Sequence, residues 1–444
     1  MDLARKVFSQ YEKNLLGNRE GYERDYNRVI TEVEKTPAKY YGKAVKFLYQ
    51  PMFFDEKDIK KFEEASYQLM KILKKVIDEY IKNKGFREFF NFSPILEQLI
   101  LKDPGYNIPV PMARFDVFYY PTGEFKFCEL NADGSSGMVE TRELQNIFND
   151  SLAIDELKKD YDITTFELFD SWVDALLYNY RQFSGGDKNP NVAIIDRFSS
   201  TIPNEFIEFQ KVFEKRGYPT IIADIRELDY RDGKLFYKDF QIDCIYRRAV
   251  TWEIIERPGE TRAFIDAYLD GRVCVVGPIR SQIIHNKNIF NILHDPLKTG
   301  FLTEDEREFI TKYIPYTRFF DKDNKELVDF TIANKDDLVL KPLDKYASYG
   351  VNIGRDFTLQ KWKDVINNQG QEEYLLQDFC KLPNMPMAIF KNHDIKFIGT
   401  NYVLGLYLYN ERFQGVYTRT SQQNVVGVIG EFAAVPNFLV KEKL

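Results

Sequence analysis

The first hundred residues carry the hydrophobic periodicity of amphipathic helices. In EKDIKKFEEASYQLMKILKKVIDEYIKN, residues 56–83, apolar side chains recur at three- and four-residue steps, which places them on one helix face. That face consists of Ile59, Phe62, Leu69, Leu73, Val76 and Tyr80. We expect residues 1–100 to form a helical region that supports the rest of the chain and carries little chemistry.

The pattern changes in MARFDVFYYPTGEFKFCELNAD, where two extended runs flank Pro121–Gly123. Proline presets φ and glycine permits positive φ, so this stretch predicts a β-hairpin. A loop of two or four residues would place Asp116 opposite Glu129 and Arg114 opposite Asn131, all on one face. A loop of three residues would shift this pairing by one position.

A helix that begins near Gly137 is expected directly after the second strand. The first N–H groups of a helix have no intrahelical partner. We therefore expect free N–H groups beside Ser135 and Ser136, where an anion could bind.

Residues 186–280 show the pattern of a parallel α/β unit. A loop-like stretch, SGGDKNPN, precedes the strand VAIID, a helical run over residues 204–216 and the strand YPTIIADI, an order typical of a parallel sheet. The runs IDCIYRR and VCVVGP add buried strands. We expect a Rossmann-like subdomain, and without GxGxxG there is no reason to place a dinucleotide on it.

The C-terminal third returns to mixed structure, with the runs DLVLKPL and EEYLLQDF, a hairpin-like pair around FKNHDIKFIGTNYVL, and VYTRTSQQNVVG. A chain of 444 residues is too long for one ordinary core. We predict an α+β protein with an α/β insert. Its expected parts are the helical region 1–100, the hairpin-bearing part 101–185, the subdomain 186–280 and the remainder 281–444.

Composition argues against a nucleic-acid-binding protein. With a net charge of −7, the chain lacks the excess of basic residues that binding to nucleic acid requires. No run approaches ~20 apolar residues, and the N-terminus lacks the apolar block of a signal peptide. The four cysteines show no CxxC spacing, and His285, His294 and His393 are too dispersed for an obvious zinc site. We expect a cytoplasmic protein with reduced thiols.

Three oxygen-bearing side chains of the predicted hairpin are candidate metal ligands: Asp116, Glu129 and Asn131. Oxygen ligands suit Mg²⁺, which is usually shared between one or two carboxylates and substrate phosphates. The alternative is a solvated hairpin whose charges face water. Arg114 shares the same face and suits an acyl phosphate or a transferring γ-phosphoryl group. Alternatively, it forms a salt bridge with Asp116.

Candidate nucleotide ligands lie in the C-terminal third. Lys341 ends an apolar strand, where burial is costly unless the ammonium meets a nucleotide phosphate or a carboxylate. The loop with Ser348 and Gly350 could cover phosphates with its N–H groups, or be a surface turn. Gln377 and Asp378 could form a hinge whose backbone pairs with adenine, or belong to a core strand.

Two further polar segments are open to two interpretations. Lys287 lies in the basic helical run IIHNKNIFNILH and could reach a nucleotide or be solvated. Arg419, Ser421 and Asn424 form a polar run between apolar segments, which is either a loop or an anion-binding edge.

In order along the chain, these motifs resemble the ATP-grasp ligases of the glutathionylspermidine synthetase type. The related circularly permuted ATP-grasp proteins are similar too. The matching motifs are RFD, ELNADGSSGM, HNKNIFNILHD, LVLKPL with YGVNIG, YLLQDF and YTRTSQQN. The most specific of them is RFD followed by ExN, in order and spacing.

The resemblance implies an ATP-grasp fold and an ATP-dependent carboxylate–amine ligase that uses ATP and two Mg²⁺ ions. The carboxylate would attack the γ-phosphate to give an acyl phosphate, and an amine would then displace phosphate to form an amide. The implied roles are magnesium ligands at Asp116, Glu129 and Asn131, a transition-state arginine at Arg114, nucleotide contacts at Lys287 and Lys341, an adenine-side strand at Gln377, Asp378 and Phe379, and a phosphate-facing Arg419.

The chain also departs from that family. We expect no amidase activity, because these 444 residues leave no room for the cysteine amidase domain of the bifunctional members. The phosphate loop DKYASYG is poor in glycine, and acidic residues for a polyamine cannot be placed. The partners we expect are small-molecule carboxylate and amine substrates, with neither nucleic acid nor membrane, and a homodimer stays open. The competing hypotheses are a catalytically silent ATP-binding sensor or scaffold, and a small-molecule kinase.

Overall fold

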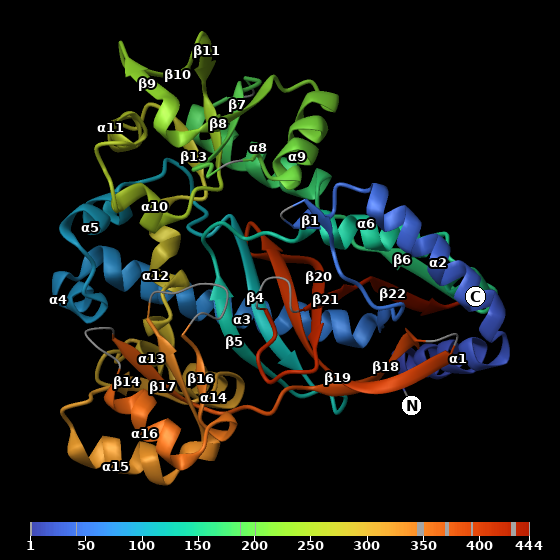
Figure 1. Ribbon diagram of the computed structural model, residues 1–444. Helices are drawn as coiled ribbons and strands as arrows, with labels where there is room; N and C mark the ends of the chain where they lie inside the picture. Colours follow the sequence, from blue (N-terminus) through green and yellow to red (C-terminus); the bar gives the residue numbers. More distant parts are fainter. Residues whose placement is uncertain are drawn as a thin grey trace.

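The computed structural model describes residues 2–40, 42–186, 188–199, 201–343, 350–368, 373–391, 394–427 and 432–443. A six-stranded antiparallel sheet forms its centre, in the order β21-β20-β19-β4-β5 with β18 beside β19 (Figure 1). The strands of this central sheet are β4 (Met112–Tyr119), β5 (Phe125–Asn131), β18 (Asn384–Lys391), β19 (Asp394–Tyr409), β20 (Arg412–Ser421) and β21 (Ala433–Val435).

The N-terminal region is mainly helical, with α1 (Leu3–Gly17), α2 (Arg19–Lys35), α3 (Glu56–Lys82), α4 (Lys84–Arg87) and α5 (Pro94–Leu101). The amphipathic stretch of the sequence is α3, which Asp55 and Asp58 start with a capping box. The face that periodicity predicted packs on one side of the hairpin, in the same core as Phe115 and Phe127. Three short strands in this region were not predicted: β1 (Lys39–Tyr40), β2 (Lys43–Ala44) and β3 (Met52–Phe54).

The β4–β5 hairpin has the predicted pairing for an unexpected reason. Asp116 lies opposite Glu129 and Arg114 opposite Asn131. The loop, however, has three residues, Pro121–Gly123, because Tyr120 N–H donates to Glu124 O across it. A β-bulge at Cys128 supplies the extra residue that restores the register, since Asp116 pairs with Glu129 but its neighbour Val117 pairs with Phe127. Bulges of this kind re-aim side chains beside functional sites.

The α/β insert is a four-stranded parallel sheet in the order β13-β12-β7-β8 (upper part of Figure 1). Its elements are β7 (Val192–Asp196), α9 (Asn204–Lys215), β8 (Thr220–Asp224), β12 (Cys244–Arg247), α11 (Arg262–Leu269) and β13 (Cys274–Val276), with α8 (Asp170–Ser184) before them. The sequence did not predict the small antiparallel sheet made of β9 (Leu228–Arg231), β10 (Lys234–Tyr237) and β11 (Phe240–Ile242).

The orange lobe of Figure 1 is a second antiparallel sheet, in the order β14-β17-β15-β16, with a hydrophobic core of its own around Trp362. Its elements are β14 (Thr317–Phe320), α15 (Lys325–Ala333), β15 (Leu338–Pro342), β16 (Asn352–Ile353), α16 (Leu359–Asn367) and β17 (Tyr374–Asp378). A separate core allows the lobe to move as a unit against the central sheet.

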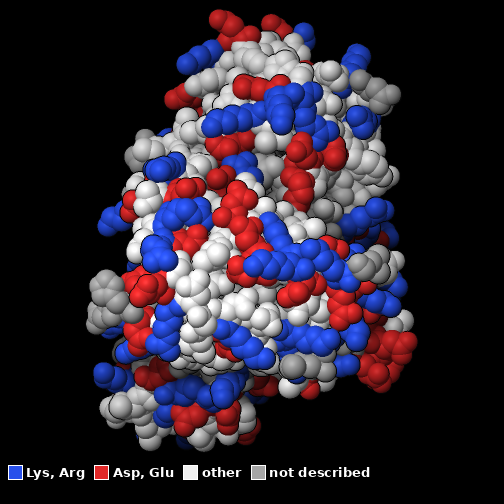
Figure 2. All heavy atoms as spheres, turned by 90° about the vertical axis from the view of Figure 1, so that its right-hand side faces the viewer, with Lys and Arg blue, Asp and Glu red and all other residues white. Residues whose placement is uncertain are grey.

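Remaining elements connect or cover these units: α6 (Met138–Asn149), α7 (Leu152–Leu157), α10 (Thr251–Ile255), α12 (Gln282–His285), α13 (Asn288–His294), α14 (Glu304–Tyr313), and a sheet of β3 with β6 (Tyr161–Thr165) and β22 (Asn437–Glu442). No helix of the described residues combines the length and the hydrophobicity needed to span a bilayer. On the face shown in Figure 2, described basic and acidic side chains alternate without a continuous basic field.

Candidate active site

One face of the hairpin carries a compact network centred on the buried carboxylate of Asp116. Arg114 Nε donates to Asp116 Oδ1 at 3.0 Å. The second carboxylate oxygen, Oδ2, accepts from Asn131 Nδ2 at 3.1 Å and from an Arg419 guanidinium nitrogen at 2.6 Å. Because Arg114 and Arg419 both face Asp116, its negative charge fixes two guanidinium groups at this point.

The charge of Asp116 also keeps Arg114 protonated. Burial by itself lowers the pKa of Arg114, but Asp116 outweighs it and raises that pKa above the ordinary value. Arg114 thus stays a cation, and its second arm donates to Ser136 O at 2.7 Å. Arg419 Nε is buried without a hydrogen-bond partner among the described residues, which leaves a spare donor for an anion.

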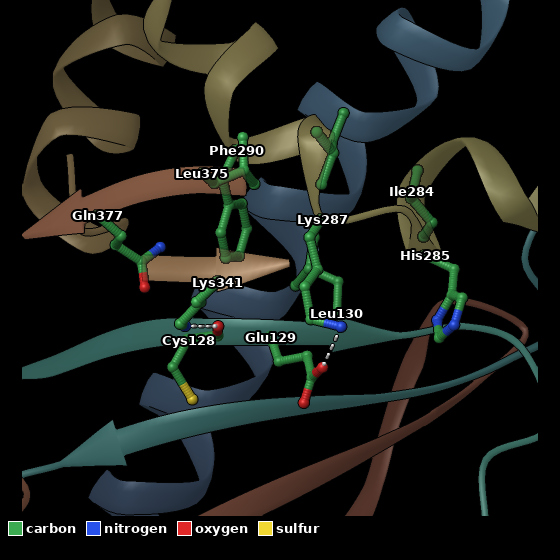
Figure 3. Close-up of a pocket in the computed structure, with 11 residues that line it drawn as sticks. Cys128, Glu129, Leu130, Ile284, His285, Lys287, Phe290, Lys341, Leu375 and Gln377 are labelled. Atoms are coloured by element: carbon green, nitrogen blue, oxygen red, sulfur yellow. Dashed lines mark hydrogen bonds and ion pairs between the residues drawn. The ribbon is translucent and has the colours of Figure 1, made fainter. Parts of the chain in front are cut away.

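Glu129 faces two lysines that come from other parts of the fold (Figure 3). Lys287 Nζ lies 3.2 Å from Glu129 Oε1, and Lys341 Nζ donates to Cys128 O at 3.4 Å. Burial raises the pKa of Glu129, but the charges of Lys287, Lys341 and His285 outweigh burial and lower that pKa to about 2. Burial lowers the pKa of Lys341. Glu129 therefore stays ionised at neutral pH.

These residues line a closed cavity between β5, the α12–α13 junction and strands β15 and β17. Its volume is about 10 Å³, which is roughly the space of one water molecule. A cavity of this volume is too small to hold a nucleotide.

The setting of Lys287 differs from the prediction. The run IIHNKNIFNILH is two short helices, α12 and α13, and Lys287 is the N-cap residue of the second. The break turns the lysine towards Glu129, whereas a continuous helix was expected. His285, which the sequence did not single out, lines the same cavity, and its Nδ1 lies 3.4 Å from Ala132 N.

The predicted adenine strand is more enclosed than expected. Gln377 is 4% exposed and donates to Thr317 Oγ1 at 2.8 Å, although it also lines the cavity. The N–H groups of Asp378 and Phe379 donate to Tyr316 O and Asp337 O at 2.9 and 2.8 Å. These two N–H groups are therefore unavailable to a base while those bonds persist.

Two other predicted residues, Gly350 and Asn424, do not join the network. Ser348 lies outside the described residues, as does His393, and Gly350 lies in an exposed turn with a φ of +75°. Asn424 donates to Asp356 Oδ1 at 2.7 Å. The polar run around Arg419 is largely strand β20 and not a loop, and Ser421 Oγ at its end accepts from Gln423 N.

The expected free N–H groups after the second strand are not free. The N–H groups of Gly137, Met138 and Val139 at the start of α6 donate to Glu205 Oε2 at 3.0, 2.8 and 3.3 Å. Glu205 comes from α9 of the insert, which sequence spacing could not connect with this loop. The prediction of an open anion site at this helix start is wrong.

Two buried arginines of the insert, Arg247 and Arg248, bind the loop after β5. Arg247 lies 2.5 Å from Asp133, with 1% and 2% of the two side chains exposed, and Asp133 also accepts from Thr251 N at 2.7 Å. Arg248 forms an ion pair with Glu205 at 3.0 Å and donates to Ser135 O. None of these residues was predicted as functional from the sequence, although two arginines at the end of the buried run IYRR were a usable signal.

The oxygen-bearing side chains of the hairpin are of the types that bind magnesium. Asp116, Glu129 and Asn131 offer two carboxylates and one amide carbonyl, since the Asn131 Nδ2 points to Asp116 and its oxygen points elsewhere. An ionised carboxylate has about four lone-pair sites, so Asp116 keeps acceptor capacity beside its arginines. Among the described residues no three His, Cys, Asp or Glu side chains form a metal-binding group, so a Mg²⁺ ion here would need phosphate oxygens as well.

The family model of glutathionylspermidine synthase preATP-grasp matches residues 33–439. The chain belongs to this family. The ATP-grasp fold predicted from the motif order is thereby confirmed, together with its α/β insert and α+β character. No curated protein matches the chain.

Two solved structures are similar to this glutathionylspermidine synthase-type chain to different degrees. A glutathione synthetase-like effector from Globodera pallida, in its apo form, has 12% identity and a TM-score of 0.60, over 94% of this chain and 96% of that one. A putative gamma-glutamylcysteine synthetase from Methylobacillus flagellatus has 10% identity and a TM-score of 0.42, over 88% and 89%. At 12% identity, the similarity to the Globodera pallida effector shows the fold alone.

Proposed function

We propose that this family member is an ATP- and Mg²⁺-dependent carboxylate–amine ligase that forms an amide bond through an acyl phosphate. The observation that carries the proposal is the convergence at Asp116: two arginines and Asn131 contact one buried carboxylate. Two lysines face Glu129 on the neighbouring strand. Cations arranged in this way suit a substrate whose negative charge grows and moves during reaction.

Each group has a definite task in this mechanism. Asp116, Glu129 and Asn131 would hold Mg²⁺, which neutralises phosphate charge when it is bound. Lys287 and Lys341 would exchange their present partners, Glu129 Oε1 and Cys128 O, for phosphate oxygens.

The reaction has two steps. In the first, a carboxylate oxygen of the substrate bonds to the γ-phosphorus and the bond to the ADP oxygen breaks. In the second, the amine nitrogen bonds to the acyl carbon, phosphate leaves, and the nitrogen loses a proton. Arg114 and Arg419 would bind the transferring group and hold the carboxylate in line with it.

Nucleotide entry requires movement of the lobe. The present cavity of about 10 Å³ admits no nucleotide, and the lobe of β14–β17 has a separate core. We infer that the lobe swings as a unit, which breaks the contact between Lys341 and the hairpin and opens the cavity. This gating would exclude water from the acyl phosphate once the lobe closes again.

Isosteric substitutions test the site. Alanine at 116 would strip two buried guanidinium groups of their partner, so Asp116→Asn and Glu129→Gln are the cleaner variants. We expect each to lower ADP release by roughly 100-fold or more, the scale of one lost electrostatic donor, with an unchanged circular dichroism spectrum. Glu124→Gln, at the exposed turn of the same hairpin, is the matched control and should keep full activity. ADP release within a fewfold of wild type in both site variants would refute the assignment.

The reaction type needs a second experiment. A coupled ADP-release screen over amino acids, small peptides and polyamines with Mg²⁺ would identify the substrates. A ligase sustains ADP release over many turnovers only when carboxylate and amine are both present, because the amine must consume the acyl phosphate, whereas a kinase sustains it without the amine. A silent sensor would bind MgATP in a calorimetric titration and release no ADP with any pair.

A further inference from the structure

A second cavity lies at the turn end of the β4–β5 hairpin, away from the residues around Asp116. Its volume is about 460 Å³, within the range of ~300–1,000 Å³ that is typical of small-molecule sites. Four distant parts of the chain enclose it: the start of α1, the segment from β3 into α3, the hairpin turn Tyr119–Gly123, and the β18–β19 pair around Met385 and Tyr402.

The walls of this turn-end cavity are apolar and largely aromatic. They include Phe8, Met52, Phe53, Phe54, Tyr119, Tyr120, Met385 and Tyr402. The tyrosine hydroxyls are occupied, because Tyr402 donates to Tyr119 O at 2.6 Å and Tyr120 to Lys381 O at 2.8 Å. These tyrosines therefore present ring carbon to an occupant and no free hydroxyl donor.

The carboxylates of the cavity are already committed to internal bonds. Asp55 Oδ1 accepts from the N–H groups of Lys57 and Asp58 at 2.9 and 3.2 Å. Asp58 accepts the Tyr119 hydroxyl and Asp55 N–H, and burial raises its pKa. Asp2 accepts from Arg5 N at 3.1 Å.

The cations, in contrast, keep donor capacity. The Lys57 ammonium has no hydrogen-bond or ion-pair partner within the described part of the chain. Lys61 Nζ donates to Gly123 O at 2.5 Å, which occupies one of its three N–H bonds. The N-termini of α1 and α3 border the same cavity, but their caps Asp2 and Asp55 already accept from the first N–H groups. The donor capacity that remains at this edge therefore lies on the Lys57 and Lys61 ammonium groups.

We propose that the turn-end cavity binds a small molecule with an apolar body and one anionic group, of the class of medium-chain or aryl carboxylates. The apolar body would lie against Phe8 and Phe54, and the carboxylate would meet the ammonium groups of Lys57 and Lys61. The site lies outside the proposed catalytic network and does not depend on it. It touches the turn of the same hairpin, so an occupant would contact the element whose other end carries Asp116.

Calorimetric titration of the full-length chain with decanoate, decan-1-ol and decylamine, without nucleotide, tests both parts of the proposal. We expect saturable decanoate binding at least about tenfold tighter than that of the alcohol, because a hydrogen bond to an ionised carboxylate is stronger than one to a neutral hydroxyl. Tighter binding of decylamine, equal binding of all three, or no saturable binding of decanoate would each overturn it.

Variants locate the site. Lys57→Glu should weaken decanoate by about tenfold or more and leave decan-1-ol unchanged. Lys60→Glu is the matched control, since that lysine is exposed on the same helix and outside the cavity lining. Met385→Trp should narrow the cavity and weaken both ligands, with thermal unfolding used to confirm folding. Decanoate binding that is unaffected by Lys57→Glu would show that the ligand lies elsewhere and would refute the proposal.

Discussion

We predict that one side chain, that of Asp133, holds the α/β insert on the loop beside the hairpin through its ion pair with Arg247. The pair lies at 2.5 Å with its side chains 1% and 2% exposed. Arg247 donates to Ala249 O at 2.6 Å and to Gly277 O, and Asp133 also accepts from Thr251 N. Asp133→Ala would leave the buried guanidinium without its counter-charge, although its two backbone acceptors remain, and would leave the Thr251 N–H without a partner.

The expected cost follows from that geometry. Removing one partner of a buried ion pair destabilises a protein by about 3–5 kcal/mol, because the remaining charge stays desolvated. The orphaned Thr251 N–H places Asp133→Ala towards the upper end, since an unsatisfied buried donor costs about 1–3 kcal/mol. Asp133→Ala combined with Arg247→Met should cost less than Asp133→Ala alone, because no unpaired charge remains.

The assay is urea unfolding followed by circular dichroism, with hydrogen exchange of residues 132–137 as a local readout. The exposed pair of Arg262 and Asp266, at 2.7 Å with the arginine side chain 74% exposed, is the control. Asp266→Ala should change the free energy of unfolding by only about 0.5 kcal/mol. If Asp133→Ala costs less than about 1 kcal/mol, or the double variant costs the sum of the singles, the argument from desolvation fails.

Three further predictions concern activity at the proposed site and the pH dependence of stability. An alanine Cβ at Gly405 would lie 2.6 Å from Arg114 Cδ, so Gly405→Ala should displace that guanidinium and lower ADP release by roughly 10- to 100-fold; Gly399→Ala on the same strand should not. Burial and then the neighbouring Glu205 raise the pKa of Glu140 to about 7, so folded Glu140 holds its proton more tightly than unfolded Glu140. The stabilisation by this proton is fully present below about pH 4.5 and is lost as pH rises through 7. In urea titrations, the free energy of unfolding should fall less between pH 5 and pH 8 for Glu140→Gln than for the wild type. Chelation of divalent ions with EDTA should abolish ADP release, and added Mg²⁺ should restore it.

Local pattern predicted much of the scaffold. The three- and four-residue spacing in residues 56–83 is α3, and alternating runs around the Pro121–Gly123 loop are the β4–β5 hairpin. Strand–helix–strand order is the parallel sheet of the insert. These features depend on interactions between residues near one another in sequence, so spacing alone is informative.

Residue chemistry also predicted a large part of the candidate network. Four predicted residues lie on the hairpin, and a fifth contacts it from the second lobe: Arg114, Asp116, Glu129 and Asn131, with Lys341. Their roles in catalysis stay a prediction. The pairing of Asp116 with Glu129 depended on a loop length that was not the real one, and the bulge at Cys128 compensated for it.

What the sequence by itself determined is therefore the longer helices and strands, the family motifs and the side chains that face one another across a single hairpin. Only the tertiary structure decided that Glu205 closes the start of α6 and that Arg247 pairs with Asp133. The physical reason is separation along the chain: these partners lie 67 and 114 residues apart, so no local period links them. They meet only when the insert packs against the central sheet, and there burial forces each charge to find a partner.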